Sequence, residues 1–537
     1  MKAAKIIAAV VLVVLGFLAG YLFLPAINLL HGDIYWFVFF MLLLATAVYA
    51  VIEYFEDEEY IITKIMGIAT GVVLIVIIIG GITSAKMFHA DSYKAIADVE
   101  VENFSEDFPD VTIQDINDVA IVDLDTARRL GDRTIGNIEH ASWYEVDPEY
   151  NLIMYNGEAY RISPLNYGGF FKYQKAGSIP GYVLVNASTQ EATFVESEML
   201  YSPSAYFSYD LTRHLRNNYS SYKFGKSYME IDDEGRPFWV TTVKKSTVGL
   251  FGGKKVVSVI VTDAKTGECT EYTIDSIPEW VDHAFELDYL MDIAYYHFEY
   301  VNGFWNFSKT GIYRTTYTYR SNNSEDKTPF YGYNSFINKD GNVCFYTGLT
   351  PANKAETNVG FILLDTRTGK ISQYEIAGAE ESSAQSAAEG LVQNLGYTST
   401  FPTMINVNGN ATYLMALKDK AGLIQRYALV NMQNYTIAVE SETLEGAIDK
   451  YLNKMGMSSD SEAGTGEEHT ATVKIREIYT AEIEGTTVFY YLFENDDKLY
   501  KASILLNESQ ILFKVGDTVS ITYVEGDNYN TVTNISA

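Results

Sequence analysis

Cysteine is almost absent from this chain, since Cys269 and Cys344 are the two present in 537 residues. A disulfide framework of the kind that holds small secreted domains together is therefore excluded. The two cysteines fall in different parts of the chain, and the sequence leaves open whether they pair. A chain with so few cysteines must rely on its hydrophobic core, which for an exported protein is typical of the bacterial envelope.

Basic residues are also scarce. The chain has 39 Lys and Arg against 69 Asp and Glu, a formal net charge of -30 and a pI near 4.6. Binding of nucleic acid needs clustered Lys and Arg on one face, so this partner class is excluded. An acidic excess favours solubility, or the attraction of cations and basic partners.

Motifs of catalysis and metal binding are missing. No pair of histidines has the His-x-x-x-His spacing and no Cys/His cluster occurs, so a zinc site is not predicted. The seven histidines are His31, His89, His140, His214, His283, His297 and His469. No Gly-x-Ser-x-Gly elbow occurs either. We therefore predict no catalytic residue, no cofactor and no metal ion, and expect that the protein is not an enzyme.

Two local patterns imitate functional motifs without matching them. The acidic runs Glu53–Glu59, Asp232–Glu234 and Glu494–Asp497 lack the spacing of an EF-hand loop, and whether they bind Ca²⁺ stays open. The segment Val248–Val257, which contains Gly252-Gly253-Lys254-Lys255, lacks the full phosphate-loop pattern, so we interpret it as the tip of a hairpin.

Three long apolar runs are present near the N-terminus, at residues 6–30, 34–52 and 65–85. Each is long enough to cross the hydrocarbon core of a bilayer, so residues 1–85 are predicted to form a three-helix transmembrane anchor. Lys2 and Lys5 precede the first run, and cytoplasmic flanks carry the excess of Lys and Arg. This places the N-terminus in the cytoplasm and the chain after about residue 86 outside it.

Small residues within the runs indicate how the helices pack. Gly16 and Gly20 in the first run, and Gly67 and Gly71 in the third, each form a Gly-x-x-x-Gly step. Such steps let helix backbones approach closely in lipid. We predict that they pack the three helices on one another, with homo-oligomerisation through the same faces as the alternative.

The remainder of the chain has a repeating pattern. A stalk and entry segment (86–142) precedes four units, at 143–222, 223–330, 331–398 and 399–455. Each unit has a turn signal such as Asn156-Gly157, a strand pair and a following helix. This order predicts tandem antiparallel sheets, each covered by a helix, and an α+β fold.

The strand–Asp-x-x-Thr-Gly–strand–helix pattern resembles the PepSY-like, cystatin-like modules of bacterial envelope proteins. Two units carry it, with Asp263, Thr266 and Gly267 in one and Asp365, Thr368 and Gly369 in the other. The first and fourth units depart from it, since Asn186 and Asn431 replace the Asp and the turn has no Gly. More broadly, the multi-span anchor with this ectodomain resembles a group of bacterial membrane proteins. The resemblance implies regulation or inhibition of an envelope enzyme.

A polar linker (456–468) is followed by short alternating strands at 469–537. This pattern predicts a small C-terminal β-barrel of the OB or SH3-like kind. An OB-fold binds single-stranded nucleic acid through a basic aromatic groove, and this segment has few Lys or Arg.

An aromatic stretch at 294–307 supplies the candidate partner-binding residues Tyr295, Tyr296, Phe298, Tyr300, Phe304 and Trp305. They either pack between the units or form an exposed patch that binds a partner. We predict a membrane-anchored extracytoplasmic binding or scaffold protein with an envelope protein as partner. Two alternatives remain: an envelope hydrolase whose carboxylates come from distant residues, and an accessory subunit of a transport or sensing complex.

Overall fold

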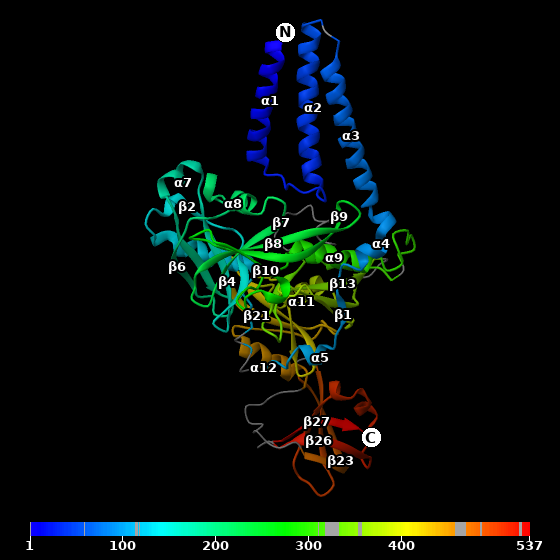
Figure 1. The fold of residues 1–537 in the computed structure, drawn as a ribbon. Helices are drawn as coiled ribbons and strands as arrows, with labels where there is room; N and C mark the ends of the chain where they lie inside the picture. Colours follow the sequence, from blue (N-terminus) through cyan, green and yellow to red (C-terminus); the bar gives the residue numbers. More distant parts are fainter. Residues whose placement is uncertain are drawn as a thin grey trace. The chain divides into compact units, whose positions relative to one another are not determined.

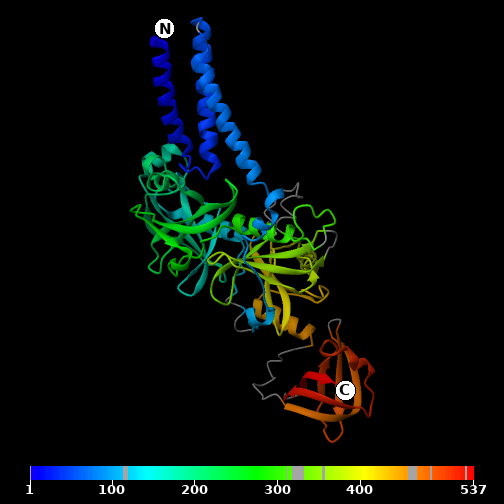
Figure 2. The same ribbon diagram turned by 45° about the vertical axis from the view of Figure 1, so that its right-hand side comes forward.

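A computed structural model describes residues 2–57, 59–112, 116, 119–309, 311–316, 332–352, 357–456, 469–483, 486–525 and 529–536. The chain is mixed α+β and has two compact units (Figures 1 and 2). The first unit comprises Met1–Asn103 and Val122–Ile376, and the second comprises Phe104–Ile121 and Ala377–Ala537. The predicted linker, except Gly456, lies outside the described residues.

The three predicted apolar helices are confirmed. They are α1 (Lys2–Phe23), α2 (Gly32–Phe55) and α3 (Ile61–Thr83), with mean hydropathies of 2.8, 2.2 and 2.7 over their apolar windows. Their length and composition are those of membrane-crossing helices. The first helix ends at Phe23 instead of continuing to residue 30, because Pro25 disfavours a helical conformation for the residue before it.

Polar contacts fix α3 against α2 at the end far from the sheets. The carboxylate of Glu53 accepts hydrogen bonds from the backbone N–H groups of Ile62 and Thr63 at 3.0 and 3.2 Å. These two donors belong to the first turn of α3, where N–H groups have no partner within the helix. The side chain of Glu53 in α2 therefore caps the N-terminus of α3.

The first sheet has the order β2-β4-β5-β6, with β3 paired to β4. Its strands are β2 (Tyr144–Val146), β3 (Asn151–Tyr155), β4 (Glu158–Tyr167), β5 (Ile179–Asn186) and β6 (Ala192–Met199). Helix α6 (Leu124–Thr134) packs on β5 and β6. Asn156 and Gly157 form the two-residue turn between β3 and β4 with φ of 52° and 82°, as predicted for a hairpin.

Two short helices border this sheet. Helix α7 (Phe170–Ala176) lies between β4 and β5, and α8 (Leu211–Asn218) follows β6 and the 3₁₀ turn η4 (Phe207–Tyr209). The side chain of Asp210 accepts a hydrogen bond from the N–H of Arg213 and so caps the start of α8.

The second sheet is a meander of four antiparallel strands in the order β10-β9-β8-β7. They are β7 (Lys223–Ile231), β8 (Pro237–Val248), β9 (Gly252–Asp263) and β10 (Cys269–Thr273). Val248 pairs with Gly252, so the tip of this hairpin is formed by residues 249–251, and the glycine-lysine segment Gly252–Lys255 is the first part of β9 next to it. Helix α9 (Leu287–Glu299) follows.

The third sheet has the order β1-β16-β15-β13-β11, with β12 paired to β13. Its strands are β1 (Val99–Val101), β11 (Tyr313–Thr315), β12 (Asn334–Ile337), β13 (Val343–Pro351), β15 (Gly360–Asp365) and β16 (Ile371–Tyr374). Strand β1 comes from the predicted stalk and pairs in parallel with β16. Part of that segment, after α4 (Lys86–Lys94), is therefore an edge strand.

One turn geometry recurs in the hairpins β5–β6, β9–β10 and β15–β16, and in the later hairpin of β21 (Ile424–Asn431) and β22 (Ala438–Ser441). The side-chain oxygens of Asn186, Asp263, Asp365 and Asn431 each accept two backbone N–H groups, two and three residues further on, at 2.7–3.0 Å. An amide oxygen accepts these bonds as a carboxylate does. The change from Asp to Asn therefore preserves the turn.

The turn has one residue with a positive φ, and this residue need not be glycine. Gly267 and Gly369 have φ of 76° and 77°, and Gln190 adopts φ of 67° at the matching place of the first sheet. The first turn thus keeps its conformation without glycine, at the cost of a strained backbone.

In the second unit, a sheet of order β18-β20-β21-β22, with β19 paired to β20, is packed by two helices. Its elements are α11 (Glu381–Leu391), β18 (Thr398–Ser399), β19 (Thr403–Val407), β20 (Asn410–Lys418), β21 (Ile424–Asn431), β22 (Ala438–Ser441) and α12 (Leu444–Lys454). Residues after α5 (Phe104–Asp107) join this core, in which Ile116 and Ile121 are buried beside α12.

The C-terminal region is a closed barrel of order β23-β24-β25-β27-β26, which confirms the predicted small barrel. Its strands are β23 (His469–Ile483), β24 (Thr486–Phe493), β25 (Tyr500–Ser503), β26 (Thr518–Val524) and β27 (Asn530–Ser536). Strand β23 pairs first with β26 and then with β24, and β25 pairs with β27 in parallel.

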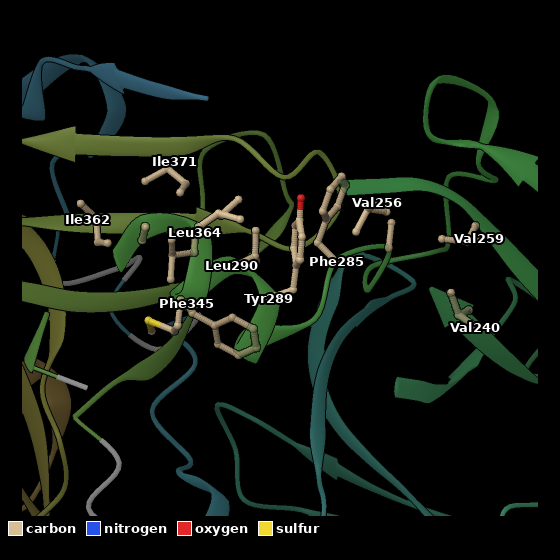
Figure 3. Close-up of a cluster of buried hydrophobic side chains, with 14 of the residues drawn as sticks. Val240, Val256, Val259, Phe285, Tyr289, Leu290, Phe345, Ile362, Leu364 and Ile371 are labelled. Carbon is tan, nitrogen blue, oxygen red and sulfur yellow. The ribbon is translucent and has the colours of Figure 1, made fainter. Parts of the chain in front are cut away.

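Helix α9 packs between the second and third sheets (Figure 3). Leu290 of α9 lies in one apolar cluster with Val240 and Val259 of the second sheet and with Ile362 and Leu364 of the third. The prediction assigned each helix to one sheet. Since α9 is apolar on more than one face, it covers two sheets and unites their cores.

The hairpin tip of β8–β9 joins the second sheet to the membrane helices. The ring of Phe251 lies 5.5 Å from that of Tyr35 in α2, and its backbone N–H donates to the hydroxyl of Ser84 at 2.9 Å. A Cβ atom at Gly80 of α3 would stand 1.9 Å from a ring carbon of Phe251. Gly80 is thus the residue that makes room for the ring.

This contact predicts that alanine substitution lowers the stability of the junction at Gly80 and not at the adjacent Gly81. Gly80→Ala would force Phe251 out of its site and destabilise the junction by about 1–3 kcal/mol, as overpacking does. Gly81→Ala meets no atom within 4 Å and serves as the matched control. Thermal unfolding of the detergent-solubilised chain, with amide hydrogen exchange at residues 248–252, measures the difference. Equal behaviour of the two variants would contradict the assignment.

Candidate functional site

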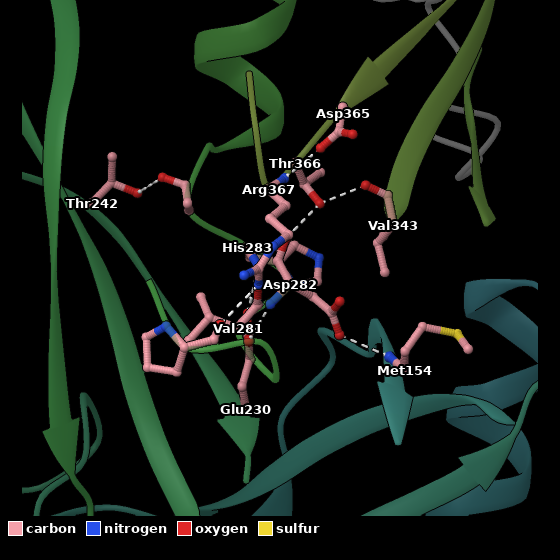
Figure 4. A network of polar contacts seen from close by, with 12 residues as sticks. Met154, Glu230, Thr242, Val281, Asp282, His283, Val343, Asp365, Thr366 and Arg367 are labelled. Carbon is pink, nitrogen blue, oxygen red and sulfur yellow. Dashed lines mark hydrogen bonds and ion pairs between the residues drawn. The ribbon is translucent and has the colours of Figure 1, made fainter. Parts of the chain in front are cut away.

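A cluster of ionisable groups in the first unit forms a buried polar junction between its three sheets (Figure 4). Glu230, near the end of β7, has no exposed surface. Its two carboxylate oxygens accept the backbone N–H groups of Asp282 and His283, both at 2.7 Å. Nδ1 of His283 lies 3.0 Å from the same carboxylate, and the ring stacks on Tyr228 with centroids 4.7 Å apart.

Asp282 extends the junction to the first sheet. Its carboxylate accepts the backbone N–H of Met154 in β3 at 2.8 Å. Burial raises the pKa of Asp282 well above its ordinary value, and the negative charge of Glu230 raises it further. The N–H of Met154 and the guanidinium of Arg367 act in the opposite direction.

The turn after β15 joins the junction from the third sheet. The hydroxyl of Thr366 has two acceptors, the carbonyl oxygens of Asp282 and of Val343, and its oxygen lies 2.7 Å from each. The guanidinium of Arg367 donates to the carbonyl oxygens of Pro278 and Glu279 at 2.9 and 3.0 Å. The loop between β10 and α9 is therefore held by side chains from the sheets on either side.

The burial of this cluster decides its role. Two carboxylates and a histidine are groups that hydrolases use, but a catalytic group must reach its substrate. Glu230, Asp282 and His283 are each at most 4% exposed, and backbone N–H groups occupy the carboxylates. The geometry is that of a structural junction. No signal in the sequence points to it, because the residues that Glu230 contacts lie more than 50 positions further along the chain.

The predicted partner-binding residues differ in how far their side chains are exposed. Phe298 and Tyr300 are buried, Tyr295 and Tyr296 are half-buried, and Phe304 and Trp305 are exposed. Tyr296 is packed by the ring of Tyr93 at 5.1 Å and by the ammonium group of Lys86 at 4.4 Å.

The exposed group continues beyond the predicted set to Phe307. Trp305 is 58% and Phe307 84% exposed, and the Trp305 ring lies 5.1 Å from Phe304 and 5.8 Å from Phe307. We call Phe304, Trp305 and Phe307 the α9 aromatic surface. Contiguous exposed aromatic side chains are typical of interaction sites.

Three of the four candidate helix-packing glycines face α2. The Cβ positions of Gly16, Gly20 and Gly67 lie 3.6–3.9 Å from Met41, Phe37 and Thr46, while that of Gly71 has no neighbour within 4 Å. Sequence reasoning missed Gly80, although the Gly-Gly pair near the end of the third apolar run was visible.

Among the described residues, no group of three or more His, Cys, Asp or Glu side chains could hold a metal ion. Both cysteines are free thiols in the structure, with Cys344 buried in β13 and Cys269 half-buried in β10.

Comparisons with known proteins add little. No family model matches the sequence, and no curated protein matches it. Among solved structures, the crystal structure of Bacillus subtilis levansucrase is similar over 81% of this chain and 96% of that chain, with 10% identity and a TM-score of 0.16. A likeness at this score carries no argument about fold or activity.

One prediction for the buried junction concerns Glu230. Glu230→Ala removes the acceptor of three N–H groups and leaves them buried, so it should destabilise the fold by about 3–5 kcal/mol. Glu230→Gln retains one carbonyl oxygen and should cost less. Glu268→Ala, on an exposed position of the neighbouring hairpin turn, is the control and should change stability by less than about 0.5 kcal/mol. Denaturant unfolding measures all three. A stable alanine variant would contradict the structural role.

Another prediction for the junction concerns the dependence of stability on pH. Because the pKa of Asp282 is raised in the folded chain, the proton binds more tightly there than in the unfolded chain. The resulting stability is complete below the ordinary carboxyl pKa of 3.8 and is lost as pH rises through the raised value. Asp282→Asn does not titrate and keeps an oxygen for the N–H of Met154. It should therefore be at least as stable at neutral pH and show a flatter dependence of unfolding temperature on pH. A steeper dependence would refute this account.

Proposed function

We propose that this chain is a membrane-anchored binding protein that contacts a protein partner in the bacterial envelope. Its N-terminus lies in the cytoplasm and the chain after about residue 86 lies outside. The α9 aromatic surface is the observation that carries the proposal, because it is exposed on a folded unit that is attached to three apolar helices.

The sheets act as tandem PepSY-like modules in this proposal, and they regulate an envelope enzyme. The recurring Asx turn of the four hairpins supports a common module, since it persists where the sequence changes from Asp to Asn. The C-terminal barrel is OB-like, which is supported by its five strands, its long shared first strand and its parallel β25–β27 pair.

A binding role fits the chemistry better than hydrolysis. The carboxylates and histidine that the fold brings together are buried and bonded to the backbone, so substrate does not reach them. Exposed Trp and Phe side chains contribute large contact areas at low entropic cost, and such side chains dominate binding energy at interfaces.

Cross-linking in living cells tests the proposal. A photo-reactive amino acid replaces Trp305, and the captured proteins are identified by mass spectrometry. The control site is Thr189, which is exposed at the β5–β6 turn of the first sheet. We expect one specific envelope protein at residue 305 and not at residue 189.

Substitution of a neighbouring aromatic residue extends the same experiment. Phe307→Ala should reduce capture at residue 305 by roughly tenfold, because loss of one interface aromatic costs more than about 1.4 kcal/mol. Tyr435→Ala, at an exposed aromatic residue that belongs to neither surface, should leave capture unchanged. Capture that is absent, or insensitive to Phe307, would refute the α9 aromatic surface as the binding site.

A further inference from the structure

A second exposed aromatic surface lies on α7 and η4, next to the membrane helices. It comprises Phe170, Phe171 and Phe207, flanked by Lys172 and Lys175, and we call it the α7 surface. Phe171 is 77% and Phe207 is 52% exposed. The ring of Phe170 lies 5.6 Å from that of Phe171 and 5.9 Å from that of Phe207, so the three rings form one apolar area.

Contacts of α8 place this surface beside the end of α1. The guanidinium of Arg213 lies 3.7 Å from the ring centre of Tyr21, and Nε of Arg216 donates to the carbonyl oxygen of Leu24 at 3.1 Å. Helix α8 follows η4 directly, and η4 carries Phe207. In both views, α7 and α8 lie near the end of α1 (Figures 1 and 2).

A second backbone connection fixes the same position. The N–H of Ile27, in the segment between α1 and α2, donates to the carbonyl oxygen of Ser220 at 2.8 Å. The side chain of Asn28 donates to the carbonyl oxygen of Ser221 at 3.0 Å. The chain that leaves α1 is therefore attached to the residues after α8, and the α7 surface has a fixed place at the level where α1 ends.

The charge of this region is opposite to that of the whole chain. Helix α7 contains two lysines and no acidic residue, although the chain carries a net charge of -30. Between Leu200 and Met229 the chain has four basic residues and one acidic residue, Asp210. Exposed aromatic side chains with neighbouring lysines are the composition that favours the membrane–water interface.

The backbone at Phe207 supports a role for its exposed ring. Its φ of 57° lies in the left-handed region, which a bulky residue rarely adopts. Strain of this kind at an exposed aromatic residue is consistent with a functional position.

We infer that the α7 surface lies in the interfacial layer of the bilayer that α1, α2 and α3 cross. The rings of Phe171 and Phe207 enter the boundary between headgroups and acyl chains, and Lys172 and Lys175 contact lipid phosphates. The first sheet is thereby held against the membrane beside the end of α1.

Site-directed spin labelling of the full chain tests this inference. The chain carries Cys269→Ser and is reconstituted in vesicles of phosphatidylcholine and phosphatidylglycerol, without any other protein. Cys344 is 1% exposed and so does not react in the folded protein. Nitroxide labels are attached after Phe171→Cys, Phe207→Cys or Thr189→Cys. Thr189 follows β5 at its far end, and α7 precedes the strand, so the control lies about 25 Å from the α7 surface.

Collision rates with oxygen and with a water-soluble nickel complex distinguish lipid from water. We expect the oxygen-to-nickel accessibility ratio at residues 171 and 207 to exceed that at residue 189 several-fold. A ratio at residue 171 equal to that at residue 189 in vesicles would overturn the inference and would leave a protein partner as the occupant of the α7 surface.

Discussion

The carboxylate of Glu230 holds the loop on which the first unit depends. This loop connects β10 to α9, and its backbone N–H groups at Asp282 and His283 have no strand to pair with. A buried N–H without an acceptor is costly, so the fold requires an acceptor there. Once Glu230 fixes the loop, α9 is positioned to cover the second and third sheets, and the two cores become one.

The same unit is tied to the membrane helices at two separated places. Phe251 from the β8–β9 tip packs against α2 and α3, and the arginines of α8 contact the end of α1. A single contact would allow the sheets to rotate about it. Two contacts, to different helices, restrict rotation of the sheets about the anchor. The orientation of exposed surfaces relative to the bilayer is therefore a property of the fold.

Local sequence determined the elements that depend on few neighbours. Apolar runs predicted the three helices, and Asn156-Gly157 predicted a hairpin whose φ angles follow from local sterics. The pairing of strands that are distant in the sequence could not be predicted. Nothing near Val99 indicates that it pairs with Ile371, and the shared core of α9 depends on sheets that lie before and after it. Glu230 looked like any strand glutamate until its partners, more than 50 residues away, were placed.

Aromatic residues show most clearly why composition alone does not locate a site. The stretch after Tyr289 contains buried rings such as Phe298 and exposed ones such as Trp305, and only packing separates them. The α7 surface was not predicted because Phe171 and Phe207 are far apart in the chain. Charge adds the decisive constraint. A chain with a net charge of -30 is repelled by an anionic membrane, and the repulsion is strongest for the part nearest the surface. The basic residues around α7 and α8 reduce it where α1 ends, so the distribution of charge, as well as the helices, sets which end of the first sheet faces the bilayer.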